Sequence, residues 1–305
     1  MKNSNAVIIP YCLVLLQGVL YGFGDPISKA AYEVMPVYSL LTVRYLIATC
    51  FLMLFFAKPV LRGLKESSVR EWMLPSVCIA AGYIAGNIAL DLTAATTVAF
   101  LRSLLTVMTP ILAFICYKKK YYWSHLPILV AVVIGMYLLC GMGGLGKFGA
   151  GEIWSLACAA LEAGALVFGE KALQNTSPLS LTTVQCGMSC AMALICALLF
   201  EGGVQVHGDS AALTSGGMSM TMVWLTIVYL AILCTVAGYF LQNVAMKKIS
   251  SSSVALLQCF CPVMTALFSR IILAEKLSVA GNIGAAIILI CVIAESLIQN
   301  KQDSI

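Results

Sequence analysis

Ten apolar segments, each about twenty residues long, follow one another along this chain with little sequence between them. A helix needs about 20 mostly apolar residues to cross the hydrocarbon core of a bilayer, so each segment is long enough to be a transmembrane helix. Charged residues make up only 10% of the 305 residues, whereas about 25% is usual in soluble domains. So little charge cannot cover a water-soluble surface of this size, which excludes a cytosolic enzyme, a disordered protein and a nucleic-acid-binding protein. The predicted spans are 8–30, 37–57, 72–91, 95–117, 125–143, 152–172, 179–200, 222–246, 251–273 and 278–298.

The 13 cysteines are scattered singly through the apolar segments, a spacing that indicates neither a disulfide framework nor a paired zinc site. In such segments a free cysteine behaves as a small hydrophobic residue. The two histidines, His125 and His207, belong to no HExxH or HxH pattern. We therefore expect no cofactor, no metal and no disulfide.

The distribution of Lys and Arg predicts the orientation in the membrane. If the N-terminus is cytoplasmic, the loops and helix ends on that side hold twelve Lys and Arg residues, against three on the other side, namely Lys29, Lys147 and Lys276. Positive charge is enriched in cytoplasmic loops. The sequence thus predicts an integral multi-pass protein, in the plasma membrane of a bacterium, with both termini in the cytoplasm.

The chain also repeats itself. Residues 81–109 and 237–265 share eleven identities at a constant shift of 156, including a Gly-Tyr pair and an Asn in register. A weaker match relates 39–44 to 180–185 at a shift of 141, and the longer loop near 201–221 accounts for the difference. Such internal similarity predicts two halves with the same architecture, 1–145 and 146–305.

Each half would contain five helices, and because five is odd, the second half must cross the membrane in the opposite sense. The charges agree: Lys118, Lys119 and Lys120 follow the fourth predicted span, whereas the equivalent turn of the second half reads Ala274, Glu275 and Lys276. The expected fold is an all-α membrane protein with ten transmembrane helices arranged as two inverted five-helix repeats. Inverted repeats are typical of secondary transporters, whose substrate site lies near the midplane between the repeats.

Several residues carry a resemblance to the EamA branch of the drug/metabolite transporter superfamily. They are Tyr21-Gly22 with Lys29, Pro36 followed by Arg44, Ala255-Leu256-Leu257, Pro262-Val263-Met264 and Ala274-Glu275-Lys276. The resemblance extends over nearly the whole chain and implies a ten-helix transporter. It implies little about the substrate, because members of that family move unrelated small metabolites.

Ionisable residues inside the spans are the first candidates for function, because charge is costly within a bilayer. Arg102 and Arg44 could each face the cavity and bind a substrate carboxylate in a bidentate fork. Alternatively, Asp25 pairs with one of them and locks helices together. Glu162, near the middle of the sixth span, is the candidate for proton coupling, because a carboxyl group in a medium of low dielectric can exchange a proton near neutral pH.

A symmetric polar set is formed by Asn87 and Asn243 with Tyr83 and Tyr239, which occupy equivalent positions in the two halves. Each Tyr precedes its Asn by four residues and therefore lies on the same helical face. These residues could line the substrate pathway, or they could only hold helices together through hydrogen bonds.

Three glutamines complete the candidate site. Gln185 occupies the position equivalent to Arg44, and Gln258 the position equivalent to Arg102. A site lined by both halves would then carry charge on one side only, which suits a polar or zwitterionic ligand. Gln17, in the first span, is a further possible cavity residue.

We therefore expect a secondary-active transporter that works by alternating access on a small polar or amphipathic metabolite, such as an amino acid or a related compound. A receptor or assembly subunit that does not transport is the alternative, and an intramembrane enzyme ranks below it. The expected partners are a small-molecule substrate and membrane lipid, with a homodimer left open and no nucleic acid.

Overall fold

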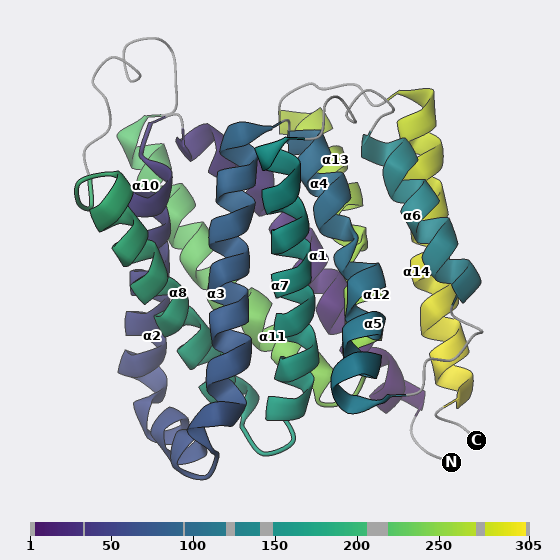
Figure 1. Ribbon diagram of the computed structural model, residues 1–305, viewed down its shortest axis with the longest axis horizontal. Helices are drawn as coiled ribbons and strands as arrows, with labels where there is room; N and C mark the ends of the chain where they lie inside the picture. The colour runs from purple at the N-terminus through teal and green to yellow at the C-terminus, as the bar shows by residue number, and fades with distance from the viewer. Residues whose placement is uncertain are drawn as a thin grey trace.

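The computed structural model describes residues 4–32, 34–93, 95–119, 126–140, 149–205, 219–272 and 278–302, nearly all of them helical. These residues form one bundle whose helices run between two ends, with the start of α1 and the end of α14 at the same end (Figure 1). The helices are α1 (Ser4–Tyr32), α2 (Val37–Lys65), α3 (Val69–Leu92), α4 (Ala95–Ser103), α5 (Leu105–Tyr117), α6 (Leu126–Cys140), α7 (Ala150–Ala172), α8 (Pro178–Phe200), α10 (Met220–Tyr229), the π-helical segment η2 (Leu230–Ala237), α11 (Gly238–Met246), α12 (Ser251–Gln258), α13 (Phe260–Ile272) and α14 (Val279–Gln302).

Several of these helices are parts of one longer unit. Only Leu104 separates α4 from α5, only Cys259 separates α12 from α13, and α10, η2 and α11 follow without a gap. Counted in this way, the described residues form ten helical units, as the hydropathy predicts. Eight units contain an apolar stretch of 18 residues or more, and the remaining two contain the shorter apolar stretches Leu126–Leu139 and Val279–Ala294.

One helix is longer than the sequence indicates. The second span was expected to end at residue 57, but α2 continues to Lys65. Its last two turns carry the exposed side chains of Lys58, Arg62 and Lys65. Hydropathy marks where the apolar stretch ends, and a helix can continue beyond that point into water. A kink at Phe56 (φ −130°, ψ 20°) precedes Pro59 and separates the two parts, because a proline ring clashes with the carbonyl one turn earlier.

The contacts between helices respect the repeat. α3 packs on α7, and the equivalent of that pair, α11 with α1, is also in contact. Likewise α1 packs on α12 and α13, while α7 packs on α4 and α5. α3 packs on α8 as η2 packs on α2, and the pairs α2 with α8 and α6 with α14 each join equivalent helices. These contacts persist when the two halves are exchanged, as a pseudo-twofold axis requires.

The two halves are inverted relative to each other, and α7 shows it directly. Near the start of α7, Glu152 accepts a hydrogen bond from Thr93 Oγ1 (2.7 Å), which follows α3. Near its end, Glu170 accepts a hydrogen bond from the backbone N–H of Ser251 (3.0 Å), which begins α12. Eighteen residues of helix separate the two glutamates, or about 27 Å at 1.5 Å per residue. The turn after α3 and the equivalent turn after α11 thus lie at opposite ends of the bundle.

Glycine allows the closest helix contacts. A Cβ atom placed on Gly135 would lie 3.1 Å from the carbonyl oxygen of Gly284, where α6 meets α14. A Cβ atom on Gly22 would lie 2.8 Å from the backbone nitrogen of Thr265, where α1 meets α13. Small residues let helix backbones approach each other in membrane bundles, where van der Waals packing drives association.

Candidate functional site

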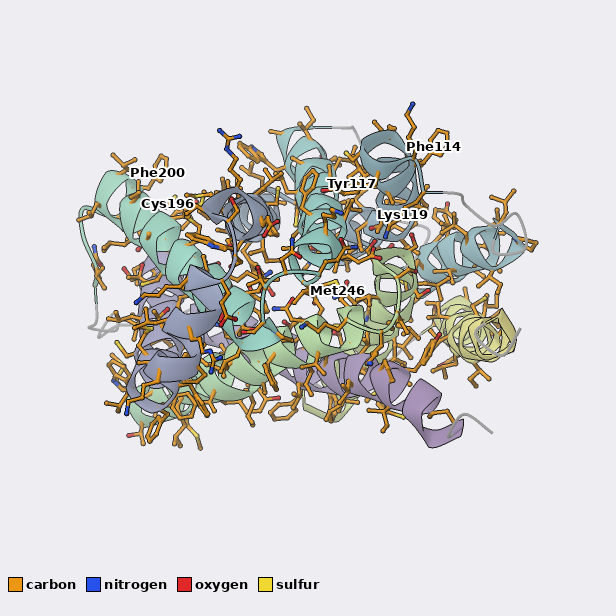
Figure 2. The ribbon with its side chains drawn as sticks, turned by 90° about the horizontal axis from the view of Figure 1, so that it is seen from below. Phe114, Tyr117, Lys119, Cys196, Phe200 and Met246 are labelled. Atoms are coloured by element: carbon orange, nitrogen blue, oxygen red, sulfur yellow. The ribbon has the colours of Figure 1, made fainter. Side chains whose placement is uncertain are left out.

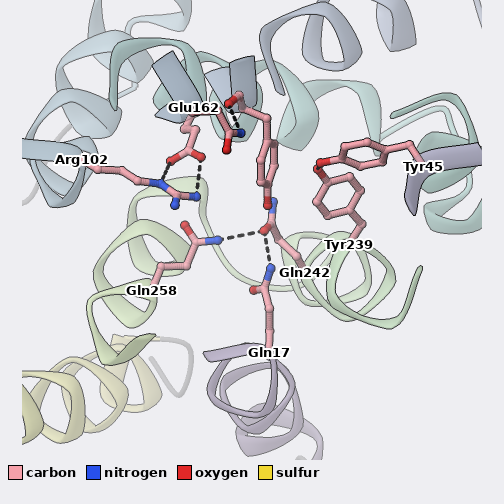
Figure 3. Close-up of polar contacts among 9 residues, drawn as sticks. Gln17, Tyr45, Arg102, Glu162, Tyr239, Gln242 and Gln258 are labelled. Atoms are coloured by element: carbon pink, nitrogen blue, oxygen red, sulfur yellow. Dashed lines mark hydrogen bonds and ion pairs between the residues drawn. The ribbon is translucent and has the colours of Figure 1, made fainter. Parts of the chain in front are cut away.

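An ion pair between Arg102 of α4 and Glu162 of α7 lies at the centre of the candidate site (Figure 3). Arg102 Nε donates to Glu162 Oε2 at 2.8 Å, and Arg102 Nη2 donates to Glu162 Oε1 at 2.7 Å. The guanidinium carbon also lies 5.7 Å from the centroid of the Tyr83 ring, within cation–π range. The two partners differ in burial, since the Arg102 side chain is 37% exposed and that of Glu162 only 8%.

Close packing of α3 on α7 positions the carboxylate. A Cβ atom on Gly82 would lie 3.2 Å from Glu162 Cγ, and one on Gly86 would lie 3.1 Å from Cys158 Sγ. Gly82 and Gly86 are four residues apart, so they share one face of α3. Larger side chains at these two positions would push α7, and with it the Glu162 carboxylate, away from Arg102.

Three tyrosines form a cluster beside this ion pair: Tyr45 of α2, Tyr83 of α3 and Tyr239 of α11. The Tyr45 and Tyr239 hydroxyl oxygens are 3.2 Å apart. The ring centroid of Tyr83 lies 6.1 Å from that of Tyr45 and 6.1 Å from that of Tyr239. Because Tyr83 and Tyr239 are equivalent in the repeat and meet each other, they lie beside the pseudo-twofold axis. Tyr45 was not among the residues that the sequence singled out.

A cluster of amides from three helices adjoins the ion pair (Figure 3). Gln242 Oε1 of α11 accepts hydrogen bonds from Gln17 Nε2 of α1 (2.7 Å) and Gln258 Nε2 of α12 (2.8 Å). Gln17 and Gln258 were candidates, whereas Gln242 was missed. Its equivalent in the first half is Gly86, so a search for positions that are polar in both halves passes over it. The useful signal would have been a polar residue next to Asn243 within an apolar span.

The equivalent asparagines make different contacts. Asn243 is fully buried, and its Nδ2 donates to Thr182 Oγ1 and Gln185 Oε1 of α8, both at 2.9 Å. Asn87 Nδ2 donates to the carbonyl oxygen of Tyr83 in its own helix, at 2.8 Å. The asparagine of the second half thus joins α11 to α8, whereas that of the first half bonds within its own helix. A role in holding helices together through hydrogen bonds therefore describes Asn243 better than Asn87.

Arg44, another arginine within the predicted spans, lies beside Tyr45 of the tyrosine cluster. Its Nε donates to Thr235 Oγ1 at 2.7 Å, and its guanidinium carbon lies 5.5 Å from the centroid of the Tyr45 ring. Thr235 belongs to η2 and donates to the carbonyl oxygen of Leu230, five residues earlier. The side chain of Asp25, the expected partner of Arg44 or Arg102, lies outside the described residues.

Polar contacts join the two halves at both ends of the bundle. At the end that carries Lys119, the Glu170 carboxylate pairs with Lys119 of the first half and also accepts the Ser251 N–H within its own half. Figure 2 looks onto this end. At the opposite end, besides the Thr93 contact, Glu201 accepts hydrogen bonds from the first turn of α2 at 2.6–2.8 Å. The central residues therefore lie between two connected ends. Within the described part of the chain, no group of three or more His, Cys, Asp or Glu side chains is placed to hold a metal ion.

Comparisons with known proteins agree with this architecture. The model of the EamA-like transporter family matches residues 8–141 and 149–295. A protein of Archaeoglobus fulgidus described as an uncharacterized transporter is 27% identical over 285 residues, which cover 92% of this chain and 84% of the relative. A solved crystal structure superposes with a TM-score of 0.77 over 99% of both chains at 18% identity. At that identity the structural likeness shows the fold alone.

Proposed function

Since this chain belongs to the EamA-like transporter family and is a multi-pass membrane transporter, we propose that it is a secondary-active carrier. It moves a small polar or amphipathic metabolite, such as an amino acid or a related compound, by alternating access. The carrier lies in the plasma membrane of a bacterium, with both termini in the cytoplasm. The family and the archaeal relative also point to transport and away from enzyme activity.

The observation that carries the proposal is the polar network that both halves build at their interface. Arg102 and Tyr83 come from the first half, and Glu162, Gln242 and Gln258 from the second. Glu162 stands near the middle of the 23-residue helix α7, which places the ion pair at about the depth of the bilayer midplane. Polar and ionisable groups at that depth are costly and mark substrate pathways in membrane proteins.

We assign roles to the candidates by their chemistry. The guanidinium of Arg102 is the group that recognises an anionic part of the substrate, and Glu162 is the group that exchanges a proton. The amides of Gln17, Gln242 and Gln258 offer hydrogen-bond donors and acceptors to the remaining polar groups.

The other candidates also line the pathway. Tyr83 lies against Arg102, and the remaining candidates lie further from the ion pair: Arg44, Asn87, Gln185, Tyr239 and Asn243. The tyrosine rings would contact the apolar part of an amphipathic ligand.

Alternating access then requires the contacts at the two ends to open one at a time. Opening the end that carries Lys119 separates Glu170 from Lys119. Opening the other end separates Glu152 from Thr93 and Glu201 from α2. The midplane network remains between the two openings, as in carriers whose repeats rock about a fixed site.

Purified protein in liposomes tests the proposal. Proteinogenic amino acids and small organic acids are first screened for thermal stabilisation of the protein in detergent, because a ligand stabilises the state that it binds. Compounds that stabilise the protein are then supplied in radiolabelled form to proteoliposomes and to protein-free liposomes. We expect saturable uptake in the proteoliposomes alone.

Two variants localise the site. Arg102→Ala should abolish both the thermal shift and the uptake. The matched control is Leu54→Ala, because Leu54 is 79% exposed on the outer surface of α2 and should leave both unchanged. If the folded protein moves none of the compounds that stabilise it, the carrier assignment is wrong.

A further inference from the structure

The Arg102–Glu162 ion pair leaves its arginine accessible and its carboxylate enclosed. The exposed fraction is 37% for the Arg102 side chain and 8% for that of Glu162. Exposing a guanidinium to lipid near the midplane would be costly, so the exposed part of Arg102 is best explained by a path that water can enter. A ligand that arrives by this path meets the cation first, which favours an anion over a cation as the ligand.

Arg102 carries a single positive charge, which the Glu162 carboxylate already balances. It does so through Nε and Nη2, one edge of the guanidinium that can bind a carboxylate in the bidentate manner. A second carboxylate on the same guanidinium would place two negative charges within a few ångström of each other in a medium of low dielectric. Like charges in such a site are relieved when one carboxyl group takes up a proton.

Glu162 is placed to be that group. The titratable groups that interact with it are Arg102 from α4, Tyr83 from α3 and Cys158, one turn earlier in α7. The other helices packed on this part of α7 supply neutral amides to the network, Gln242 from α11 and Gln258 from α12. Helix α5 is followed by Lys119, which is engaged by Glu170 at the end of α7. Arg102 is thus the cation that balances the charge of Glu162. When Arg102 pairs with a substrate carboxylate instead, a proton on Glu162 is the simplest way to remove the uncompensated negative charge.

We propose that the substrate carries a carboxylate group and that each molecule binds together with one proton, which resides on Glu162. This rests on the proposed carrier function. On binding, the substrate carboxylate takes the two N–H donors of Arg102, while the Glu162 carboxylate takes up a proton and becomes a neutral carboxyl group. On release the substrate leaves, the proton leaves Glu162, and the ion pair forms again. The exchange leaves the net charge of the pair and its ligands at zero in both states.

Tyr83 would keep the guanidinium in place during this exchange. Its ring lies against the face of Arg102, with the guanidinium carbon 5.7 Å from the ring centroid. Contact with the face leaves the N–H donors at the edge of the guanidinium free to change partners. The arginine can therefore pass from one carboxylate to another without leaving its position.

The first test uses the wild-type protein. The proteinogenic amino acids, lactate, pyruvate and succinate are each compared with the corresponding carboxamide for thermal stabilisation. We expect carboxylates among the stabilising compounds and no stabilisation by their amides. Binding of the strongest carboxylate in a weakly buffered solution with a pH indicator should remove one proton from solution for each molecule bound. Amides that stabilise as well as their acids, no stabilising carboxylate, or binding without proton uptake would each overturn the proposal.

The second test uses Glu162→Gln in proteoliposomes, with Glu66→Gln as control because Glu66 is 61% exposed and pairs with Arg62 on the surface. The glutamine cannot carry the proton, so a pH gradient should no longer drive accumulation, while exchange of labelled for unlabelled carboxylate continues. Gradient-driven accumulation that survives in Glu162→Gln contradicts the proposal. Should that variant fail to fold, the wild-type proton count decides. Saturable transport that is confined to compounds without a carboxylate group would overturn this inference and leave the carrier function standing.

Discussion

A double-mutant cycle on Arg102 and Glu162 measures how strongly the central ion pair holds the two halves together. The variants are Arg102→Gln, Glu162→Gln and the double substitution. Removing one partner of a buried pair costs about 3–5 kcal/mol, because the other charge is left without compensation. Here Arg102 is 37% exposed and keeps some contact with water, so we expect about 2–3 kcal/mol for each single variant. The double variant leaves no charge behind and should cost no more than one single variant, about 2–3 kcal/mol, which gives a coupling energy of about 2–3 kcal/mol.

A matched surface pair supplies the control. Arg62 and Glu66 are one turn apart on α2, with 82% and 61% of their side chains exposed and a single contact of 3.1 Å. An exposed pair of this kind is worth about 0.3–0.5 kcal/mol. Both cycles are measured by unfolding the protein with SDS in mixed micelles at neutral pH and extrapolating the free energy of unfolding to zero SDS. A central coupling no larger than that of the surface pair would refute our reading that the ion pair is desolvated and structurally important.

Three further outcomes follow from the packing. Gly22→Ala should lower the free energy of unfolding by about 1–3 kcal/mol, because the new Cβ would lie 2.8 Å from the backbone of α13. Gly187→Ala is the control: its new Cβ would lie 3.9 Å from the nearest atom, so the free energy of unfolding in SDS should change little. Glu201→Gln should lower the midpoint of thermal unfolding, because Glu201 accepts two backbone N–H groups at the start of α2. A charged acceptor at a helix N-terminus is worth about 1 kcal/mol. An unchanged midpoint would mean that water fully replaces the Glu201 carboxylate as acceptor. In a cysteine-free chain, T93C and K247C should react with an impermeant thiol reagent from opposite sides of the membrane; labelling of both from one side would contradict the inverted halves.

The number of helices and the repeat could be predicted because both are local properties of the sequence. A bilayer imposes a fixed length of apolar residues on each span, and duplicated residues such as Tyr83 and Tyr239 preserve their register. The same local argument placed the end of α2 too early, since charged residues beyond Phe56 continue the helix outside the apolar stretch. The resemblance to EamA transporters is confirmed by the match of the family model over both halves.

The partners within the candidate site could not be predicted in the same way. The sequence singled out Arg102 and Glu162 separately, with Asp25 as the expected partner of an arginine, and gave no sign that these two residues, 60 positions apart, pair with each other. It also missed Gln242, because the repeat placed a glycine at the equivalent position. Which faces of two helices meet depends on their rotation and tilt, and these are set by packing over their whole length.

The amino-acid sequence alone therefore determined that the chain spans a bilayer and that it consists of two similar halves of opposite orientation. It also determined which polar residues lie within the membrane spans. The length of an apolar stretch and the positive charge of a loop are local properties of the sequence, so both can be determined without knowing the tertiary structure. Only the tertiary structure decided that Arg102 pairs with Glu162, that Tyr83 meets its own counterpart Tyr239, and that two glutamines donate to the amide oxygen of a third. Those contacts arise where α1, α3, α4, α7, α11 and α12 converge, and a convergence of six helices is a property of their packing together.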